Sequence, residues 1–192
     1  MTASSRLFAI EDGRIRLADA VFIYLERTLA PPDPLPPGVT PRAYGVAPMA
    51  LSPSGSVVAA VAPGEAIWLG FQAVEPARPA TVRIRVDGLE PLDAVTGGRW
   101  DEALVEQPRN YLVCPPDYCL PGIRRSPGYL PFGLRQVSPS AEVLQELTVL
   151  AGGANPDLVV VHLIRPDTFT HLTGVVPTPL KKEDAYKGWR LP

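Results

Sequence analysis

Proline and glycine interrupt nearly every apolar run of this sequence, and that limits what the chain can fold into. The 192 residues include 24 Pro and 16 Gly. Together these make about 21% of the chain, well above the roughly 12% of average usage. Proline lacks a backbone N–H and clashes with the preceding helical turn, and glycine costs about 1 kcal/mol relative to alanine inside a helix. Long helices are therefore not expected. Hydrophobic residues still make up 46% of the chain, which is enough for a packed core of short elements.

The length of the chain predicts one domain, because 192 residues are too few for two cores of ordinary size. We expect a single β-rich domain over 1–192, with a Pro-rich connection at 30–41 and a C-terminal tail at 181–192. The six prolines of 30–41 favour a stiff, extended strap over a ligand for an SH3-type domain.

The net charge and the length of the apolar runs limit the classes of binding partner and the cellular location that we expect for this protein. The net charge is −2, which gives no electrostatic reason to bind nucleic acid or an anionic membrane. No apolar run approaches the ~20 residues that span a bilayer, and the first residues lack the pattern of a secretory signal. The sequence therefore predicts a soluble protein, cytoplasmic by default, without membrane insertion.

Residues Thr81–Val86 show the clearest strand pattern. Val82, Ile84 and Val86 alternate with two arginines, which is typical of an antiparallel strand with one face in water. Residues 158–164 form an apolar run broken only by His162, which predicts a strand buried on both faces. Turn residues recur about every ten residues from 43 onward and bound further expected strands at 43–51, 57–61, 66–74 and 110–114. The β-branched and aromatic run 21–24 favours a strand, although the leucines and valine at 17, 21, 25 and 29 recur every four residues as on a helix face.

One helix is expected near 139–151. Ser138 is a suitable N-cap, Pro139 suits the first helical position, and Gly152-Gly153 would end the helix. Its apolar stripe would consist of Val143, Leu144, Leu147, Leu150 and Ala151. With the strands, this predicts a mainly β fold: an antiparallel β-sandwich or a jelly-roll-like barrel with one short helix.

The densest unusual segment is the Pro-rich stretch 108–136, which we expect to be a long ordered loop or a set of edge turns, and the site region. Its arginines and aromatic residues suit an acidic partner or a sugar ring, through bidentate and stacking contacts. The competing interpretation, which we favour, is that the aromatic rings hold the loop in place while the arginines face water. The candidate binding residues are Tyr118, Arg124, Arg125, Tyr129, Phe132 and Arg135.

A resemblance also involves this segment. It is carried by Ala94-Val95-Thr96-Gly97, Trp100, Asn110-Tyr111-Leu112-Val113, Pro115-Pro116 and Gly122-Ile123. Over roughly residues 60–136 the chain resembles uncharacterised bacterial and fungal proteins with a β-sandwich domain. Where that family has Trp-Leu-Asp-Gly-Ile, this chain has Cys119-Leu120-Pro121-Gly122-Ile123. The resemblance implies a β-sandwich and, since the family has no established activity, assigns no catalytic residue.

The two cysteines, Cys114 and Cys119, are interpreted as a structural pair. Four intervening residues can form a turn that brings the two Cβ atoms within the ~4 Å that a disulfide requires. Zinc would need His162 and His171 as further ligands, in a spacing that fits no common zinc module. We therefore favour the disulfide and expect no metal and no cofactor. A catalytic thiol is not expected, because no Cys-x-x-Cys motif is present.

No known catalytic motif stands out, so the first hypothesis is a non-catalytic binding module. The alternative is a hydrolase- or lyase-like enzyme that uses His162 or His171 with carboxylates of the 87–106 turns. A histidine, a carboxylate and a hydroxyl within hydrogen-bond distance in a pocket would favour the enzyme. A flat apolar patch would favour the module.

The C-terminal tail is the candidate interface. Tyr186, Trp189 and Arg190 belong to the residue types enriched at interface hot spots, and the tail has too few apolar neighbours for a core of its own. The sequence thus predicts contact with a protein partner or self-association. Docking of the tail on its own sheet is equally compatible with this pattern.

Overall fold

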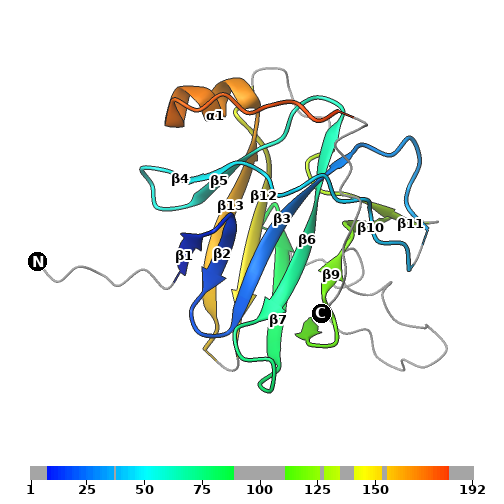
Figure 1. The fold of residues 1–192 in the computed structure, drawn as a ribbon, viewed down its shortest axis with the longest axis vertical. Helices are drawn as coiled ribbons and strands as arrows, with labels where there is room; N and C mark the ends of the chain where they lie inside the picture. Colours follow the sequence, from blue (N-terminus) through cyan, green and yellow to red (C-terminus); the bar gives the residue numbers. More distant parts are fainter. Residues whose placement is uncertain are drawn as a thin grey trace, which may run out of the picture.

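The protein is a sandwich of two stacked sheets with a small hairpin at one edge and a helix at one end (Figure 1). The computed structural model describes residues 8–36, 38–88, 111–125, 128–134, 141–152 and 155–181. The structure is mainly β: 50% of the described residues are in strands or bridges and 6% are in helix. The expected fold class is therefore confirmed.

The first sheet has five strands in the order β1-β2-β3-β6-β9, all paired antiparallel. Its centre is the long pair formed by β3 and β6, in which Val21, Ile23 and Leu25 of β3 are buried in the core. The strands are β1 (Phe8–Glu11), β2 (Arg14–Leu17), β3 (Val21–Leu29), β6 (Glu65–Ala73) and β9 (Cys119–Leu120).

The second sheet has six strands in the order β4-β5-β13-β12-β7-β8. Its pairs are antiparallel except that β5 runs parallel to β13. Val82, Ile84 and Val86 of β7 are buried and Thr81 and Arg83 are exposed, so the strand expected at 81–86 and its inward face are confirmed. The strands are β4 (Met49–Leu51), β5 (Val57–Ala60), β7 (Ala80–Val86), β8 (Leu112–Cys114), β12 (Val143–Ala151) and β13 (Asp157–Ile164).

The helix expected near 139–151 is wrong in position. Residues Val143–Ala151 form β12, which pairs with β13 on one side and β7 on the other. The apolar residues also fit period two, because Leu147, Val149 and Ala151 are buried on the core side. Hydrogen bonding to two neighbouring strands overrides a helical spacing of this length. Ser138 and Pro139 lie outside the described residues.

The helix lies instead at α1 (Pro166–Thr173). Pro166 occupies its first turn with Asp167, and Gly174 ends it with a φ of 73°, a left-handed conformation that glycine adopts readily. Phe169 of α1 packs against Val58, Ala60 and Ile164 on the outer face of the second sheet.

The expectation that residues 158–164 are buried on both faces is wrong. Val159, Val161 and Leu163 of β13 face the core, whereas Leu158 is 47% exposed and His162 is partly exposed. The helix covers only the β13 end that carries Ile164. The outer face of the second sheet is therefore partly open.

The hairpin and the Pro-rich connection close one edge of the sandwich. The hairpin is formed by β10 (Ile123–Arg125) and β11 (Gly128–Leu130). Leu35 and Tyr129 exchange backbone hydrogen bonds of 2.7 and 2.8 Å, which makes the connection a strap. Gly128 is required there, because a Cβ at this position would overlap the Leu35 carbonyl.

Candidate functional site

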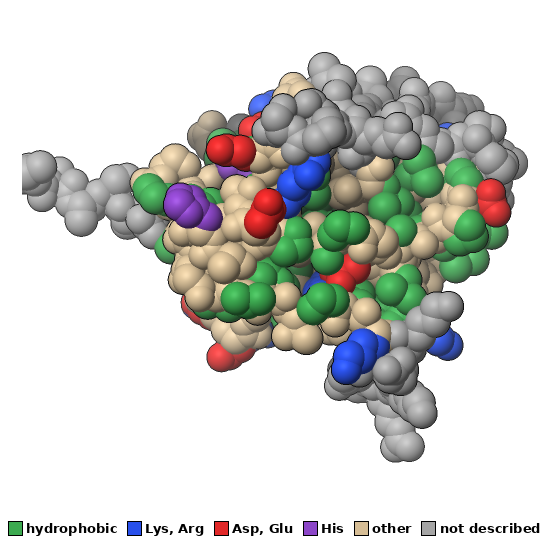
Figure 2. All heavy atoms as spheres, turned by 90° about the horizontal axis from the view of Figure 1, so that it is seen from above, with side chains coloured by type: hydrophobic (Ala, Val, Ile, Leu, Met, Phe, Trp, Pro, Cys, Tyr) green, Lys and Arg blue, Asp and Glu red, His purple; other side chains and the backbone are tan. Residues whose placement is uncertain are grey.

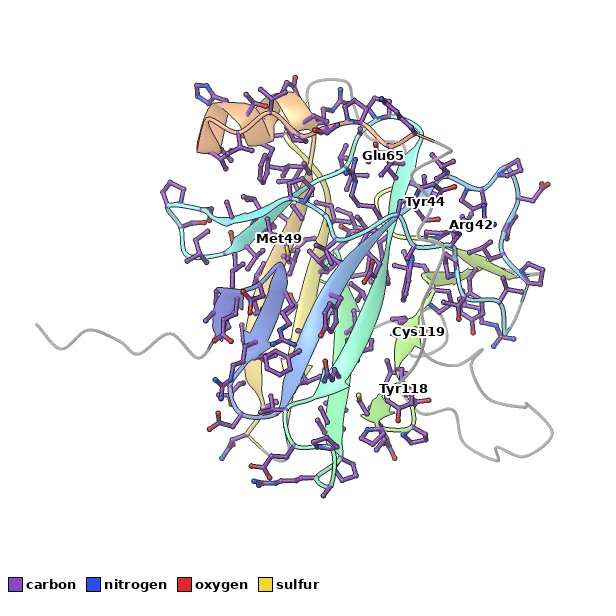
Figure 3. All side chains as sticks on the ribbon, viewed as in Figure 1. Arg42, Tyr44, Met49, Glu65, Tyr118 and Cys119 are labelled. Carbon is purple, nitrogen blue, oxygen red and sulfur yellow. The ribbon has the colours of Figure 1, made fainter. Side chains whose placement is uncertain are left out.

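The turn between β8 and β9 carries the most exposed aromatic side chain of the predicted site. Residues 115–118 join β8 of the six-stranded sheet to β9 of the five-stranded sheet. Tyr118 is 55% exposed. Figure 3 shows Tyr118 and Cys119 at β9 and Arg42 on the strap, on the same side of the molecule.

The predicted binding residues do not form one surface. Tyr129 is 1% exposed and Phe132 is fully buried, so neither ring can contact a ligand. Phe132 also exchanges backbone hydrogen bonds of 2.7 and 2.9 Å with Ile67 of β6. The interpretation of these two residues as ligand contacts is therefore corrected: they hold the segment in place, as the competing interpretation has it.

The arginines of the segment are described only in part. Arg124 lies in β10 and is half-buried. The side chain of Arg125 and the whole of Arg135 lie outside the described residues, as do Tyr186, Trp189 and Arg190. Their roles stay predictions, and so does the resemblance, whose residues 94–97, 100 and 110 also lie outside.

The cysteines lie in different sheets and both are free thiols. Cys114 is fully buried in β8, and burial raises the pKa of its thiol. Cys119 lies in β9, with its Sγ 3.6 Å from Thr40 Oγ1. The disulfide favoured by the spacing is not formed in this structure, and its formation under oxidising conditions stays a prediction. A raised pKa lowers the thiolate fraction of Cys114 and its reactivity.

A histidine, a carboxylate and a hydroxyl meet on the outer face of the second sheet. The Nε2 atom of His162 in β13 lies 3.2 Å from Oε2 of Glu146 in β12. Its Nδ1 atom lies 3.3 Å from Oγ of Ser56, directly before β5. The side chains of His162 and Glu146 are 25% and 40% exposed. The hydroxyl of Ser56 also lies 2.8 Å from that of Ser52.

Sequence reasoning named His162 but missed both of its partners. Assigning residues 139–151 to a helix concealed that Glu146 and His162 are direct cross-strand neighbours. Of the acidic 87–106 turns, Asp87 lies nearby, with Oδ1 accepting the Glu146 N–H at 3.1 Å, and residues 89–106 lie outside the described part. The signal for Ser56 was the Ser-Pro-Ser-Gly-Ser turn at 52–56, which was interpreted only as a strand boundary.

A buried ion pair fixes the segment that follows α1. Arg27 Nη2 lies 2.8 Å from Glu65 Oε2, and the side chains are only 11% and 5% exposed. The same guanidinium donates to the Thr178 carbonyl at 2.8 Å, and Leu180 N–H donates to Glu65 Oε1 at 2.7 Å. Each charge therefore holds one backbone group of residues 178–180, which fold back onto their own sandwich.

Apolar side chains are also exposed at the α1 end. Leu172, Val175 and Val176 are 45%, 55% and 75% exposed. Figure 2, viewed from this end, shows hydrophobic side chains spread over the surface. The hydroxyl, the histidine and the carboxylate thus lie within hydrogen-bond distance on a partly open face of the second sheet, and three apolar side chains are exposed at the α1 end.

Metal ligands do not cluster within the described ranges. No group of three or more His, Cys, Asp or Glu side chains gathers there in a way that could hold a metal ion. The described helix is too short to cross a bilayer. Comparison with protein-family models, curated proteins and solved structures finds no match.

Proposed function

We propose that the protein is a β-sandwich binding module that holds an acidic segment of a protein partner at the surface formed by Tyr118, Arg42 and Cys119. The observation that carries this proposal is the exposure of Tyr118 on a backbone that is fixed on both sides. Tyrosine and arginine are the residue types that contribute most to binding at interfaces.

Backbone hydrogen bonds fix the turn that displays Tyr118. Asp117 receives the Val113 N–H on its Oδ2 at 3.0 Å and donates its own N–H to the Val113 carbonyl at 2.8 Å. The Tyr118 carbonyl accepts the Phe71 N–H at 2.8 Å. Ordering a loop and its side chains opposes binding, at about 0.5–1.5 kcal/mol per side chain. The fixed turn leaves only the tyrosine ring to be ordered.

Charge points to an acidic partner. Arg42 is exposed, and its guanidinium makes no hydrogen bond or ion pair within the part of the chain that the structure describes. The contact between Thr40 and Cys119 places this part of the strap beside β9. An arginine with an available guanidinium binds carboxylates through two parallel hydrogen bonds.

A peptide library tests this function even though the partner is unidentified. Peptides displayed on phage are selected on the wild-type protein alone, and the enriched peptides are then tested on the variants. We expect the enriched peptides to be acidic and to bind Tyr118→Ala and Arg42→Ala at least about tenfold more weakly, as for hot-spot residues. Arg83→Ala, on the opposite sheet, is the matched control and should bind as the wild type does. Enrichment of peptides that bind Tyr118→Ala equally well would refute the proposal.

A further inference from the structure

The outer face of the six-stranded sheet carries a second site, on the opposite sheet from Tyr118. Val161 and Leu163 face the core, so His162 between them faces outward. Glu146 is opposite His162 in the ladder of β12 and β13 and faces the same way. Pairing of β5 with β13 brings Ser56, one residue before β5, to the same place. A hairpin and a segment about a hundred residues before it thus bring these side chains together.

The hydrogen bonds give each group a definite role. The Glu146 carboxylate only accepts, so the His162 proton lies on Nε2 when the ring is neutral. Nδ1 then carries a lone pair, 3.3 Å from the Ser56 hydroxyl. The hydroxyl therefore donates to a base whose other nitrogen is held by an acid. This is the division of roles that activates a serine nucleophile. Here Nδ1 takes the serine proton, and Nε2 faces the acid.

Neighbouring groups hold the Ser56 hydroxyl in place. The Ser52 hydroxyl accepts the Ser56 N–H at 3.2 Å and lies 2.8 Å from Ser56 Oγ. The Ser54 hydroxyl lies 3.3 Å from Ser56 Oγ. Ser56 itself is only 9% exposed, but it lies beside the exposed Ser54 and the partly exposed His162, so the solvent side of these two residues is the side from which a substrate would approach. The two serine hydroxyls place O–H donors beside the oxygen that would attack.

We propose that Ser56 is the nucleophile of an acyl-transfer site that hydrolyses carboxylic esters. Ser56 Oγ attacks the ester carbonyl carbon and forms the acyl–oxygen bond while its proton passes to His162 Nδ1. That proton goes to the leaving alcohol oxygen as the ester C–O bond breaks. Water then attacks the acyl carbon and gives a proton to Nδ1, which returns it to Ser56 Oγ as the carboxylic acid leaves. Glu146 is a positioning residue that orients the imidazole.

Two probes test this site on the intact protein. The first is p-nitrophenyl acetate, whose hydrolysis is followed by absorbance. The second is diisopropyl fluorophosphate, which forms a stable adduct with an activated serine and releases fluoride. We expect one adduct on Ser56 of the wild type, located by peptide mass spectrometry. That result does not depend on the stability of any variant. An adduct at another residue, or no adduct, would refute the proposal.

Variants separate this site from ordinary surface imidazole chemistry. Ser56→Ala and His162→Gln should each lower kcat/KM by about a hundredfold or more, as expected when members of one catalytic unit are removed. His171→Gln is the matched control, because His171 is an exposed histidine outside this network, and its rate should be unchanged. Equal rates for His162→Gln and wild type would refute the proposal. The ester assay uses no acidic peptide and the peptide assay uses no ester, so either proposal can fail alone.

Glu146 has a distinct signature. Glu146→Gln should lower kcat and leave KM unchanged, because the imidazole would lose its orientation while the surface that contacts the ester is intact. Glu146→Asp retains the charge and should recover part of kcat. A Glu146→Gln variant with wild-type kcat would show that the carboxylate plays no part in the reaction.

Discussion

Glu26 and Glu65 lie in neighbouring strands of one sheet, and both are about 95% buried, yet their carboxyl groups have different surroundings. Glu65 is held by Arg27 through two guanidinium nitrogens. Glu26 lies on the other face of β3 and makes no side-chain hydrogen bond or ion pair within the described residues, and burial raises its pKa. A buried carboxylate with a guanidinium stays charged, whereas one without a partner is driven towards the neutral acid.

The exposed pair of His162 and Glu146 provides a third environment. Solvent reaches both side chains, so neither charge depends on the other for its hydration. The buried pair of Arg27 and Glu65 therefore serves structure, and the exposed pair is available for chemistry. We therefore expect the change in folding stability to be largest for substitution of Arg27, intermediate for Glu26 and smallest for Glu146.

The largest loss of folding stability is expected from Arg27→Met. It leaves Glu65 buried without a cation and removes the donor to the Thr178 carbonyl, so the free energy of unfolding should fall by about 3–5 kcal/mol. The double variant Arg27→Met/Glu65→Leu should recover most of this loss, because an apolar pair leaves no buried charge. Urea denaturation measures both. Arg42→Met, at an exposed arginine, is the control and should stay within about 0.5 kcal/mol of wild type.

If Arg27→Met were as stable as the control, the guanidinium partner of Glu65 would not matter for stability. Glu65 and Glu26 would then not differ in the way proposed. That result would mean that burial of the Glu65 carboxyl group without Arg27 costs the folded protein little stability.

An intermediate effect, dependent on pH, is expected from Glu26→Gln. Because burial raises the pKa of Glu26 in the folded protein, the folded state holds this proton more tightly than the unfolded chain. Its contribution to stability is present below the ordinary carboxyl pKa and is lost as pH rises through the raised value. Glutamine stays neutral, so Glu26→Gln should gain stability over wild type as pH rises.

Denaturation midpoints from about pH 4 to about pH 8 measure this difference, across the ordinary carboxyl range. Glu75→Gln, at an exposed glutamate, is the control and should show no growing difference. A constant difference between Glu26→Gln and wild type would mean that folding does not raise the pKa of the Glu26 carboxyl.

The smallest effect on stability is expected from Glu146→Gln. The pair with His162 is exposed, and exposed ion pairs contribute about 0–1 kcal/mol. Thermal unfolding of this variant should therefore stay close to wild type while ester hydrolysis falls. A loss of stability as large as that of Arg27→Met would place the His162 pair among the structural contacts of the sandwich.

The spacing of apolar residues was enough to predict a strand where the sequence of that strand alone decides its structure. The strict alternation of 81–86 was enough to predict β7 and its inward face, because one side of that strand is wet. The same reasoning was wrong for β12, whose leucines and valines fit period 3.6 as well as period two. Only pairing with β7 and β13 decides between them. The signals of α1 were present in Pro166, Asp167 and Gly174 but were not used.

The two candidate sites were accessible to sequence reasoning to different degrees. Tyr118 was named because its Pro-rich segment is unusual in composition, although Tyr129 and Phe132 of the same segment proved to be core residues. The contacts of His162 depend on the register of β13 with β12 and with β5, and composition and spacing carry no information about that register.

The parallel pairing of β5 with β13 has a consequence for the order in which the molecule assembles. Ser56 and His162 are 106 residues apart in sequence, whereas hairpins such as β12 with β13 close over short loops. Closing a long loop lowers the entropy of the chain before any stabilising contact has formed. Strand pairs that are distant in sequence therefore form slowly. A chain with its hairpins already folded therefore still lacks the contact between Ser56 and His162. During refolding, ester hydrolysis should return later than β-structure does.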